Sequence, residues 1–394
     1  MHGRRTPIAA LLLSMLAFTS PALTFAPLNA SEPGAESKEV ETRTSEVPPR
    51  RPQLLDEVDW PLIRTWPAPP PPADLGPQFT AALEAARAAG GAYGITFAAV
   101  RDGELVWSGA SGRARDGRTT LAPSSPLVIG SVTKTFVAGA VLQLVDEGRV
   151  TLDHPVRRYL PQLAQLSNEI TVAQLLDHSS GLADLFNDAT RRGLEEELSR
   201  SWTADEILAT LHDPWYEPGE GWAYANTNYY LLAMLVEAVT GAPLADELNA
   251  RFIGPLGLGA TTTLDGAVAG SPLEPAWTSI FWGSGAMSAS AIDLARWGDA
   301  LYGGDLLSPG TQAAMLDVNS HDYGLGVQEL EVAGKDGYGH TGLLNTYTTL
   351  LFHLPAEGVT VALLVNRSHV DLGGMLTAAP RNGGPSLLEL ALGD

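Results

Sequence analysis

The sequence predicts an α/β protein of the α+β type, in which a central antiparallel sheet is flanked by helices and interrupted by an inserted, mainly helical region. Hydrophobic residues alternate with a period of two near both ends of the chain, in residues 93–110 and 323–366. Between these ends the apolar residues follow helical spacing, with loops rich in Gly and Asp. We therefore expect one sheet assembled from the two ends of the chain.

Composition limits the kinds of protein that this chain can be. The 394 residues are 45% hydrophobic, so the chain can bury a sizeable core in one large domain or two intimate ones. The formal net charge of −21 disfavours nucleic acid as a partner, because acidic side chains repel phosphates. The chain has no cysteine, which excludes a disulfide framework, a thiol nucleophile and a lipid anchor on cysteine.

Residues 1–30 have the pattern of a signal peptide. Arg4 and Arg5 precede an apolar run that is too short to span a membrane. Small residues follow, with alternative cleavage points at Ala22, Ala26 and Ala30. We expect a secreted or periplasmic protein with no stable membrane anchor after signal removal; a buried N-terminal helix is the alternative.

The rest of the chain divides by composition. Residues 31–75 are charged and then Pro-rich, which predicts an extended tether. One globular domain is expected over residues 76–372, with the helical insertion at about 152–275. Residues 373–394 form a C-terminal segment in which we expect a short helix packed on the sheet.

The elements before the insertion follow from local patterns. Residues 78–89 have helical spacing, and two alternating runs around Asp102 and Gly103 predict a β-hairpin over residues 93–110. Turn residues then precede a nearly continuous apolar run at 137–145, which predicts a buried helix that begins near Ser131.

Helix caps define the inserted region. Thr171 and Thr203 each stand before an apolar-periodic segment and predict two helix starts. Residues 229–239 predict an apolar helix that Gly241 ends. Residues 282–287 are small and are expected to be flexible, and residues 290–301 are expected to be helical.

The C-terminal part returns to strand spacing. Four strands are predicted over residues 323–330, 337–340, 346–354 and 359–366, with turns at 334–337 and 355–358.

Ser131 and Lys134 are the first candidate catalytic pair. At positions i and i+3 of one helix, their side chains lie on one face, one turn apart, near free backbone N–H groups that attract negative charge. The chain has three lysines against 21 arginines, so a lysine here points to a role that a guanidinium cannot fill. Burial can lower the pKa of a lysine until the neutral amine is accessible. On their own, however, such a serine and lysine are more often a helix N-cap and a first-turn charge whose head reaches solvent, so the pair needs partners elsewhere in the chain.

Two further motifs follow in order: Tyr224-Ala225-Asn226, on a turn before a helix, and His340-Thr341-Gly342. With Ser131-Val132-Thr133-Lys134 they resemble the penicillin-recognising serine hydrolases, in the branch of class C β-lactamases, Streptomyces-type D-Ala-D-Ala carboxypeptidases and related esterases and D-amino-peptidases. The resemblance covers roughly residues 77–367. It implies a β-lactamase/transpeptidase-like fold.

The resemblance also implies roles for the motif residues. Ser131 attacks an acyl carbon and forms an acyl-enzyme, which water then hydrolyses. Lys134 and Tyr224 share the proton, either as tyrosinate beside ammonium or as neutral lysine beside tyrosine. Asn226 orients Lys134 and the substrate. The remaining substrate-binding and oxyanion residues are His340, Thr341, Gly342 and Leu343, with the oxyanion between the backbone N–H groups of Ser131 and Leu343.

Departures from the family pattern bear on the substrate. His340 replaces the lysine of class C β-lactamases, which removes a permanent positive charge. Gln328 follows the turn Tyr323-Gly324-Leu325-Gly326-Val327 where the carboxypeptidase branch has an arginine that reads the terminal carboxylate. Thr346 precedes Tyr347 where that branch has a glycine.

We expect a D-Ala-D-Ala carboxypeptidase-like or β-lactamase-related peptidase that acts on a D-amino-acid peptide, a β-lactam or a small ester. The alternatives are an esterase of the same fold and a non-catalytic peptidoglycan- or penicillin-binding protein. No cofactor and no metal are assigned, because His178, His321 and His353 lack metal-ligand spacing. The oligomeric state is left open.

Overall fold

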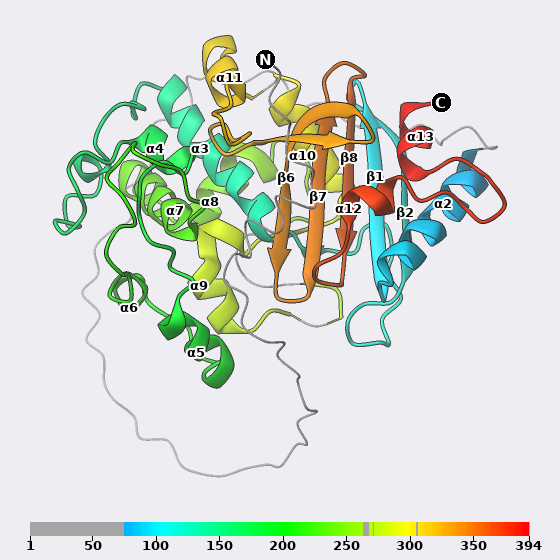
Figure 1. The fold of residues 1–394 in the computed structure, drawn as a ribbon, viewed down its shortest axis with the longest axis horizontal. Coiled ribbons are helices and arrows are strands. Elements are labelled where there is room, and N and C mark those ends of the chain that lie inside the picture. The colour runs from blue at the N-terminus through cyan, green and yellow to red at the C-terminus, as the bar shows by residue number, and fades with distance from the viewer. Residues whose placement is uncertain (1–74, 263–267, 271, 305, 394) are drawn as a thin grey trace, which may run out of the picture. The chain divides into compact units, whose positions relative to one another are not determined.

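The computed structural model describes residues 75–262, 268–270, 272–304 and 306–393 (Figure 1). The predicted signal peptide and all of the predicted tether except its last residue lie outside this part of the chain. None of the described helices is long and apolar enough to cross a bilayer.

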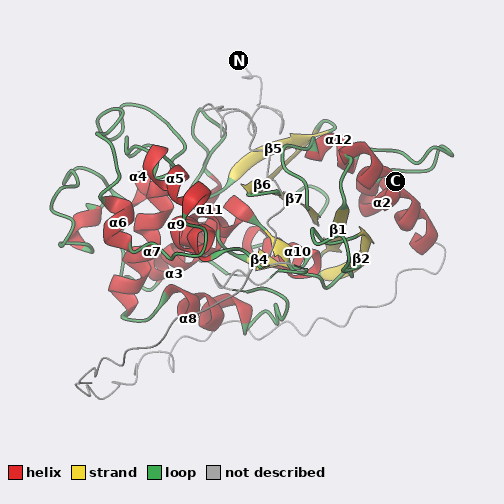
Figure 2. Cartoon of the chain, turned by 90° about the horizontal axis from the view of Figure 1, so that it is seen from below, coloured by secondary structure: helices red, strands yellow, loops and turns green. Residues whose placement is uncertain are grey.

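A six-stranded antiparallel sheet forms the centre of the fold, in the order β2-β1-β8-β7-β6-β5 (Figures 1 and 2). The strands are β1 (Gly94–Arg101), β2 (Glu104–Gly112), β5 (Gln328–Val332), β6 (Lys335–Leu344), β7 (Tyr347–Leu354) and β8 (Val359–Val365). β1 from the first part of the chain pairs with β8 from its end. The predicted fold class, with one sheet built from both chain ends, is therefore confirmed.

Alternate side chains along each strand point to opposite faces of the sheet, and each face has its own hydrophobic core. On β7, Leu350 and Phe352 pack in a cluster with helices α2 (Leu75–Gly90), α12 (Leu372–Leu376) and α13 (Leu387–Leu392). Leu351, between them, packs in the larger cluster with α3 (Thr133–Asp146) and α10 (Ala291–Tyr302). Because helices cover both faces of the sheet, the strand side chains on both faces are apolar.

The chain between β2 and β5 forms the helical region. Its other helices are α4 (Val172–Leu176), α5 (Asp188–Glu196), α6 (Ala204–Leu208), α7 (Asn226–Thr240), α8 (Leu244–Leu248), α9 (Pro275–Gly285) and α11 (Pro309–Leu316). A small second sheet pairs β3 (Leu127–Val128) with β4 (Ser288–Ala289). Thr171 and Thr203 cap α4 and α6 with capping boxes, as predicted.

The helix that carries Lys134 is buried on all sides. Every residue of α3 from Thr133 to Leu144 is buried. The ring of Trp297 on α10 stacks on Phe136 with centroids 4.0 Å apart, and its indole N–H donates to Thr135 Oγ1 at 2.8 Å. These contacts fix the first turn of α3 against the layer that covers the sheet.

Three local predictions differ from the structure. Gly130–Val132 form a 3₁₀ turn, and the α-helix begins only at Thr133. The β5–β6 hairpin turns at Ala333 and Gly334, both with positive φ, so the strands reach closer to the turn than predicted. Residues expected to be flexible at 282–287 include the buried end of α9, because Gly283 lets this helix approach α7 closely.

Candidate active site

Ser131 lies in the 3₁₀ turn that joins β3 to α3. Gly130 makes this turn possible, since its φ of 53° lies in the left-handed region. A Cβ on Gly130 would stand 2.7 Å from the Leu343 amide nitrogen, so the turn rests directly on strand β6. Ser131 is 8% exposed, whereas Lys134 is fully buried beneath it.

Lys134 Nζ has three neighbours at hydrogen-bond distance. It lies 3.2 Å from Ser131 Oγ, 2.8 Å from Asn226 Oδ1 and 2.7 Å from the Ser284 carbonyl oxygen. Two of these three are carbonyl oxygens, which can only accept. A neutral lysine therefore gives its two N–H groups to Asn226 and Ser284, and its lone pair is left for the Ser131 hydroxyl.

The orientation of Asn226 is fixed by Asp184, which the sequence analysis did not select. Asn226 donates its backbone N–H and its Nδ2 to the Asp184 carboxylate, at 3.0 and 3.1 Å. Because a carboxylate accepts only, the amide oxygen must face Lys134. The same contact satisfies the first N–H of α7, so the Asn226 side chain is not used as a helix cap.

Burial and charge set the protonation of this network. Desolvation lowers the pKa of Lys134 to about 7, and the negative charge of Asp184 opposes the drop. Burial raises the pKa of Asp184, against hydrogen bonds from Phe186 and Asn226 and the charge of Lys134. A neutral Lys134 is therefore well populated near neutral pH.

Tyr224 lies beside the lysine, which is 4.8 Å from the centre of its ring. Its buried hydroxyl makes no hydrogen bond of normal geometry, although the Ser131 hydroxyl is near enough to favour the ionised form. Burial outweighs that effect and raises the pKa of Tyr224 above its ordinary value. Of the two proton arrangements left open by the sequence, neutral lysine beside neutral tyrosine has the stronger support.

His178 supports the turn that carries Tyr224. Its ring lies 4.2 Å from the Tyr224 ring, and its Nδ1 accepts from Ala225 N at 3.2 Å and Asn228 Nδ2 at 3.0 Å. The Asn228 amide oxygen accepts from Ser180 Oγ, which fixes the direction of this bond. Burial holds the pKa of His178 well below its ordinary value, so the ring stays neutral.

His340 is buried on β6 and does not bond directly to Ser131, Lys134 or Tyr224. Its Nδ1 donates to the Thr341 carbonyl oxygen at 2.5 Å, which leaves Nε2 to accept from Tyr323 Oη at 2.9 Å. Burial and the charge of Lys134 lower the pKa of His340 to about 3. This position is therefore uncharged at neutral pH.

The backbone of β6 after His340 forms the wall opposite Ser131. A Cβ on Gly342 would stand 2.0 Å from the Ile129 carbonyl oxygen, so only glycine allows this close approach. The Leu343 amide is brought next to the turn that holds Ser131. The predicted pair of oxyanion N–H groups, from Ser131 and Leu343, thus lies on two adjacent segments.

The structure brings together the three sequence motifs and adds residues that the sequence analysis missed. Asp184 and Ser284 belong to no motif, and their partners are 42 and 150 positions away in the sequence. A single acidic residue between apolar neighbours at 182–186 was the only available signal for Asp184.

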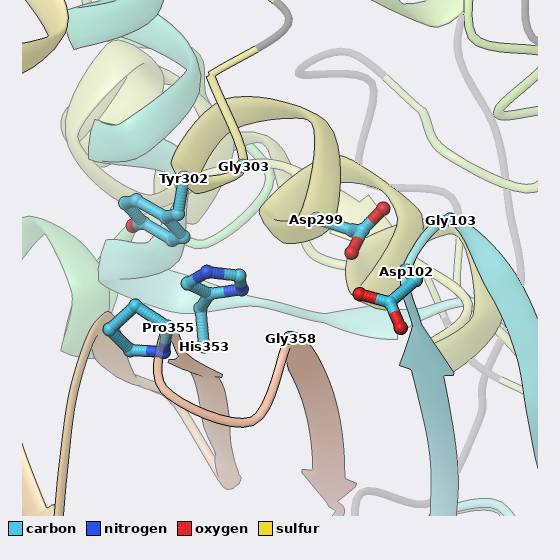
Figure 3. A pocket seen from close by; sticks show the side chains of 8 residues that line it. All are labelled: Asp102, Gly103, Asp299, Tyr302, Gly303, His353, Pro355 and Gly358. Atoms are coloured by element: carbon cyan, nitrogen blue, oxygen red, sulfur yellow. The ribbon is translucent and has the colours of Figure 1, made fainter.

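A hollow of about 390 Å³ lies beside the turn between β7 and β8, and none of the residues of the Lys134 network lines it (Figure 3). It is lined by Asp102, Gly103, Asp299, Tyr302, Gly303, His353, Pro355 and Gly358. His353 Nδ1 is 2.8 Å from Thr360 Oγ1, and burial lowers its pKa to about 4. The hollow holds no serine, so it is not the site of the acyl chemistry.

Residues 79–379 match the family described as Beta-lactamase. The chain therefore belongs to the β-lactamase family, and it has the β-lactamase/transpeptidase fold. The resemblance inferred from the three motifs is confirmed.

Individual relatives refine the comparison. The chain is 29% identical to a D-aminopeptidase of Cereibacter sphaeroides over 332 residues, 76% of this chain and 62% of the relative. It thus spans about three fifths of the length of the D-aminopeptidases that it matches. It is also 29% identical to penicillin-binding protein 4 of Amycolatopsis lactamdurans over 329 residues, 72% of this chain and 82% of the relative.

Among solved structures, a D-stereospecific amidohydrolase from a Streptomyces species is similar, with a TM-score of 0.67 and 28% identity. This similarity covers 77% of our chain and 99% of that structure.

Proposed function

We propose that this protein hydrolyses amide or ester bonds next to a D-amino acid through an acyl-enzyme on Ser131. The observation that supports this most is the environment of Lys134 Nζ, where two carbonyl oxygens take its N–H groups and Ser131 Oγ is 3.2 Å away. In this arrangement the amine is a base aimed at the serine hydroxyl.

The proton and the bonds can be followed through the reaction. Lys134 takes the Ser131 proton as Oγ bonds to the acyl carbon, and the N–H groups of Ser131 and Leu343 stabilise the oxyanion. The bond to the leaving group then breaks, and that group takes the proton from Lys134, with Tyr224 beside it. Water adds to the acyl-enzyme by the same steps, releases the acid and restores Ser131.

An amidase or aminopeptidase specificity replaces the carboxypeptidase that the sequence analysis favoured. Relatives named D-aminopeptidase and D-stereospecific amidohydrolase match over most of this chain, and both names describe action at D-amino acids. The uncharged His340 supports the same choice, because it gives no positive charge to a substrate carboxylate. Secretion by the predicted signal peptide would place the enzyme where D-amino-acid peptides of the cell wall occur.

Acylation is the decisive test. The purified protein is incubated with a p-nitrophenyl ester and with D-alanine p-nitroanilide, and the adduct is located by intact mass and peptide mapping. We expect label on Ser131 and turnover of the D-anilide but not of its L-enantiomer. Ser131→Ala should abolish both, whereas Ser125→Ala, the same change in the preceding loop, should abolish neither.

Two outcomes would contradict the proposal. Equal labelling of the Ser131→Ala protein would show that another residue reacts with the ester. Binding of peptidoglycan fragments without adduct or turnover would instead identify a non-catalytic binding protein.

A further inference from the structure

Helix α9 contains a residue whose backbone is not helical. Trp282, near the end of this helix, has a φ of 21° and a ψ of −114°, which lies outside the regions that a bulky residue ordinarily adopts. A separate last turn follows it, closed by the Ala286 N–H, which donates to the Trp282 carbonyl oxygen at 3.0 Å. The kink at Trp282 therefore sets the direction of the last turn of α9.

This last turn brings the Ser284 carbonyl oxygen to Lys134. The last four carbonyl groups of a helix have no N–H partner within the helix, and the negative end of the helix dipole lies there. The Ser284 carbonyl oxygen accepts from Lys134 Nζ at 2.7 Å. Without the kink, the axis of α9 would continue in its earlier direction and this carbonyl group would point elsewhere. The hydrogen bond to Lys134 thus depends on the backbone of Trp282.

The last turn of α9 also lies close to two other segments of the site. A Cβ on Gly283 would stand 2.5 Å from Ala233 Cβ, so the backbone of the turn rests directly on α7. A Cβ on Gly285 would stand 3.8 Å from the carbonyl carbon of Gly130, the residue before Ser131. A shift of this turn would therefore change the catalytic network on two sides.

The indole ring of Trp282 joins α9 to α7, which lies beside it (Figure 1). The ring meets Tyr230 edge to face, with centroids 5.1 Å apart. Tyr230 is one turn after Asn226 on α7. Because α7 carries Asn226 and α9 carries Ser284, the ring contact sets the spacing of the two carbonyl oxygens that accept from Lys134.

The ring of Trp282 does more than fill a core. It is only half-buried, and it lines a hollow of about 540 Å³ together with Trp202 and Met234. A strained backbone conformation persists only where the surrounding contacts hold it in place. The contact with Tyr230 is the one that the ring makes on α7.

We propose that Trp282 is a positioning residue for the base Lys134. Its backbone turns the end of α9 so that the Ser284 carbonyl oxygen reaches Lys134 Nζ, and its ring, packed on Tyr230, keeps that backbone in place. The inference rests on the proposed function for the role of Lys134 as the base. It adds a residue outside the three motifs on which the state of that base depends.

NMR of the lysine side chains tests the inference without turnover. The chain has three lysines, so ¹³C-labelled lysine gives few signals, and Lys134→Arg identifies the one from Lys134. We expect Lys134 to titrate near pH 7 in the wild-type protein and about one pH unit lower in Trp282→Ala. The reason is that a carbonyl acceptor stabilises the ammonium more than the amine. Lys335, which pairs with Glu357, should titrate alike in both proteins.

Other titratable groups face Lys134 from the elements around it, and the substitution removes none of them. They are Asp184, Tyr224, Tyr229, His178 and His340.

A graded set of variants separates the ring from the backbone. We expect kcat/KM to be highest in Trp282→Phe, lower in Trp282→Gly and lowest in Trp282→Ala, at least about tenfold below wild type. Glycine adopts positive φ without strain and needs no ring to hold it, whereas alanine is the better residue in an ordinary helix. Trp202→Ala, the same change in the same hollow, should leave kcat/KM and the titration of Lys134 unchanged.

Circular dichroism and thermal unfolding establish which variants are folded. If Trp282→Ala does not fold, Tyr230→Leu removes the other ring of the contact and should lower the titration of Lys134 in the same way. An unchanged or raised titration in the folded variant, or lower activity in Trp282→Gly than in Trp282→Ala, would overturn the inference. A failure of the proposed function appears separately, as absent acylation of Ser131 in the wild-type protein, while the NMR titration still reports on Lys134.

Discussion

At the scale of residues, a substitution of Lys134 can distinguish a proton-accepting base from a fixed positive charge. An arginine cannot be deprotonated in a protein, but it can hold the same carbonyl oxygens. Lys134→Arg should therefore reduce the rate of acylation by at least about 10²-fold, the lower range for loss of a general acid–base group. Stopped-flow measurement of p-nitrophenolate release gives this rate. Near wild-type acylation in the Arg variant would show that Lys134 is an electrostatic support and that Tyr224 is the base.

The pH dependence follows from the same residue. The pKa of Lys134 is lowered to about 7, so the neutral, reactive form increases as the pH rises through 7. We expect kcat/KM to rise from pH 6 to pH 8 and then to level off. The fitted pKa belongs to the coupled pair of Lys134 and Tyr224. A profile that is flat between pH 6 and pH 8 would contradict the assignment of Lys134 as the base.

Asp184 is a positioning residue whose effect can be separated from a structural one. In Asp184→Asn the lost negative charge no longer raises the pKa of Lys134, so the rise of kcat/KM should move to lower pH. The amide N–H introduced by this change would also face the N–H donors of Asn226. We expect this to lower the value of kcat/KM at high pH by about tenfold or more. Asp293→Asn, which changes another buried carboxylate bonded to a backbone N–H, is the control. An unchanged pH profile in the Asp184 variant would leave that residue with a structural role only.

Most of the motif residues could be found from the sequence, because they are close together within each motif. The partners that fix them could not. Asp184 and Ser284 reach Asn226 and Lys134 only after the insertion has folded, and Gln328 reaches Thr341 across a strand pair. Such contacts depend on tertiary register, which periodicity in a single chain does not contain.

At the scale of elements, the geometry of the site depends most on the close contact between β6 and the turn at Ser131. The predicted strands and helices were recovered where apolar spacing was sustained, as in β1, β7 and α7. The 3₁₀ turn at Gly130 was not, because a single left-handed residue next to a strand leaves little periodic signal. Yet this turn decides where Ser131 lies relative to the oxyanion N–H groups.

Gly342→Ala tests the contact between β6 and this turn. The added methyl group would lie 2.0 Å from the Ile129 carbonyl oxygen, so β6 must move away from the turn. We expect kcat/KM to fall by about 10² or more, since a displacement near 1 Å at a reacting centre has that effect. Gly334→Ala, in the β5–β6 turn where nothing lies within 4 Å of the added atom, tests general destabilisation of β6. Equal losses in both variants would remove the specific role of the close approach.

At the scale of the whole molecule, we expect the two faces of the sheet to have different roles. One face carries the catalytic network, and the core on the other face contributes to stability. The site lies with the core that includes α3 and α10, while α2, α12 and α13 cover the opposite face. Leu351 points to the first face and is paired across the strands with His340. Leu387 on α13 is buried in the second core.

Leu387→Ala should lower the free energy of unfolding by about 2–5 kcal/mol, as expected for a large-to-small change in a core. The kcat/KM of the folded fraction should stay unchanged, because α13 packs on α2 and β8 in the core on the other face of the sheet. Leu351→Ala should cost a similar amount of stability and also lower kcat/KM, since it removes support behind His340. Urea unfolding and ester hydrolysis on the same samples give both quantities. An equal loss of kcat/KM in the two folded variants would show that the faces are mechanically coupled through the sheet, and that the site depends on the packing of the whole domain.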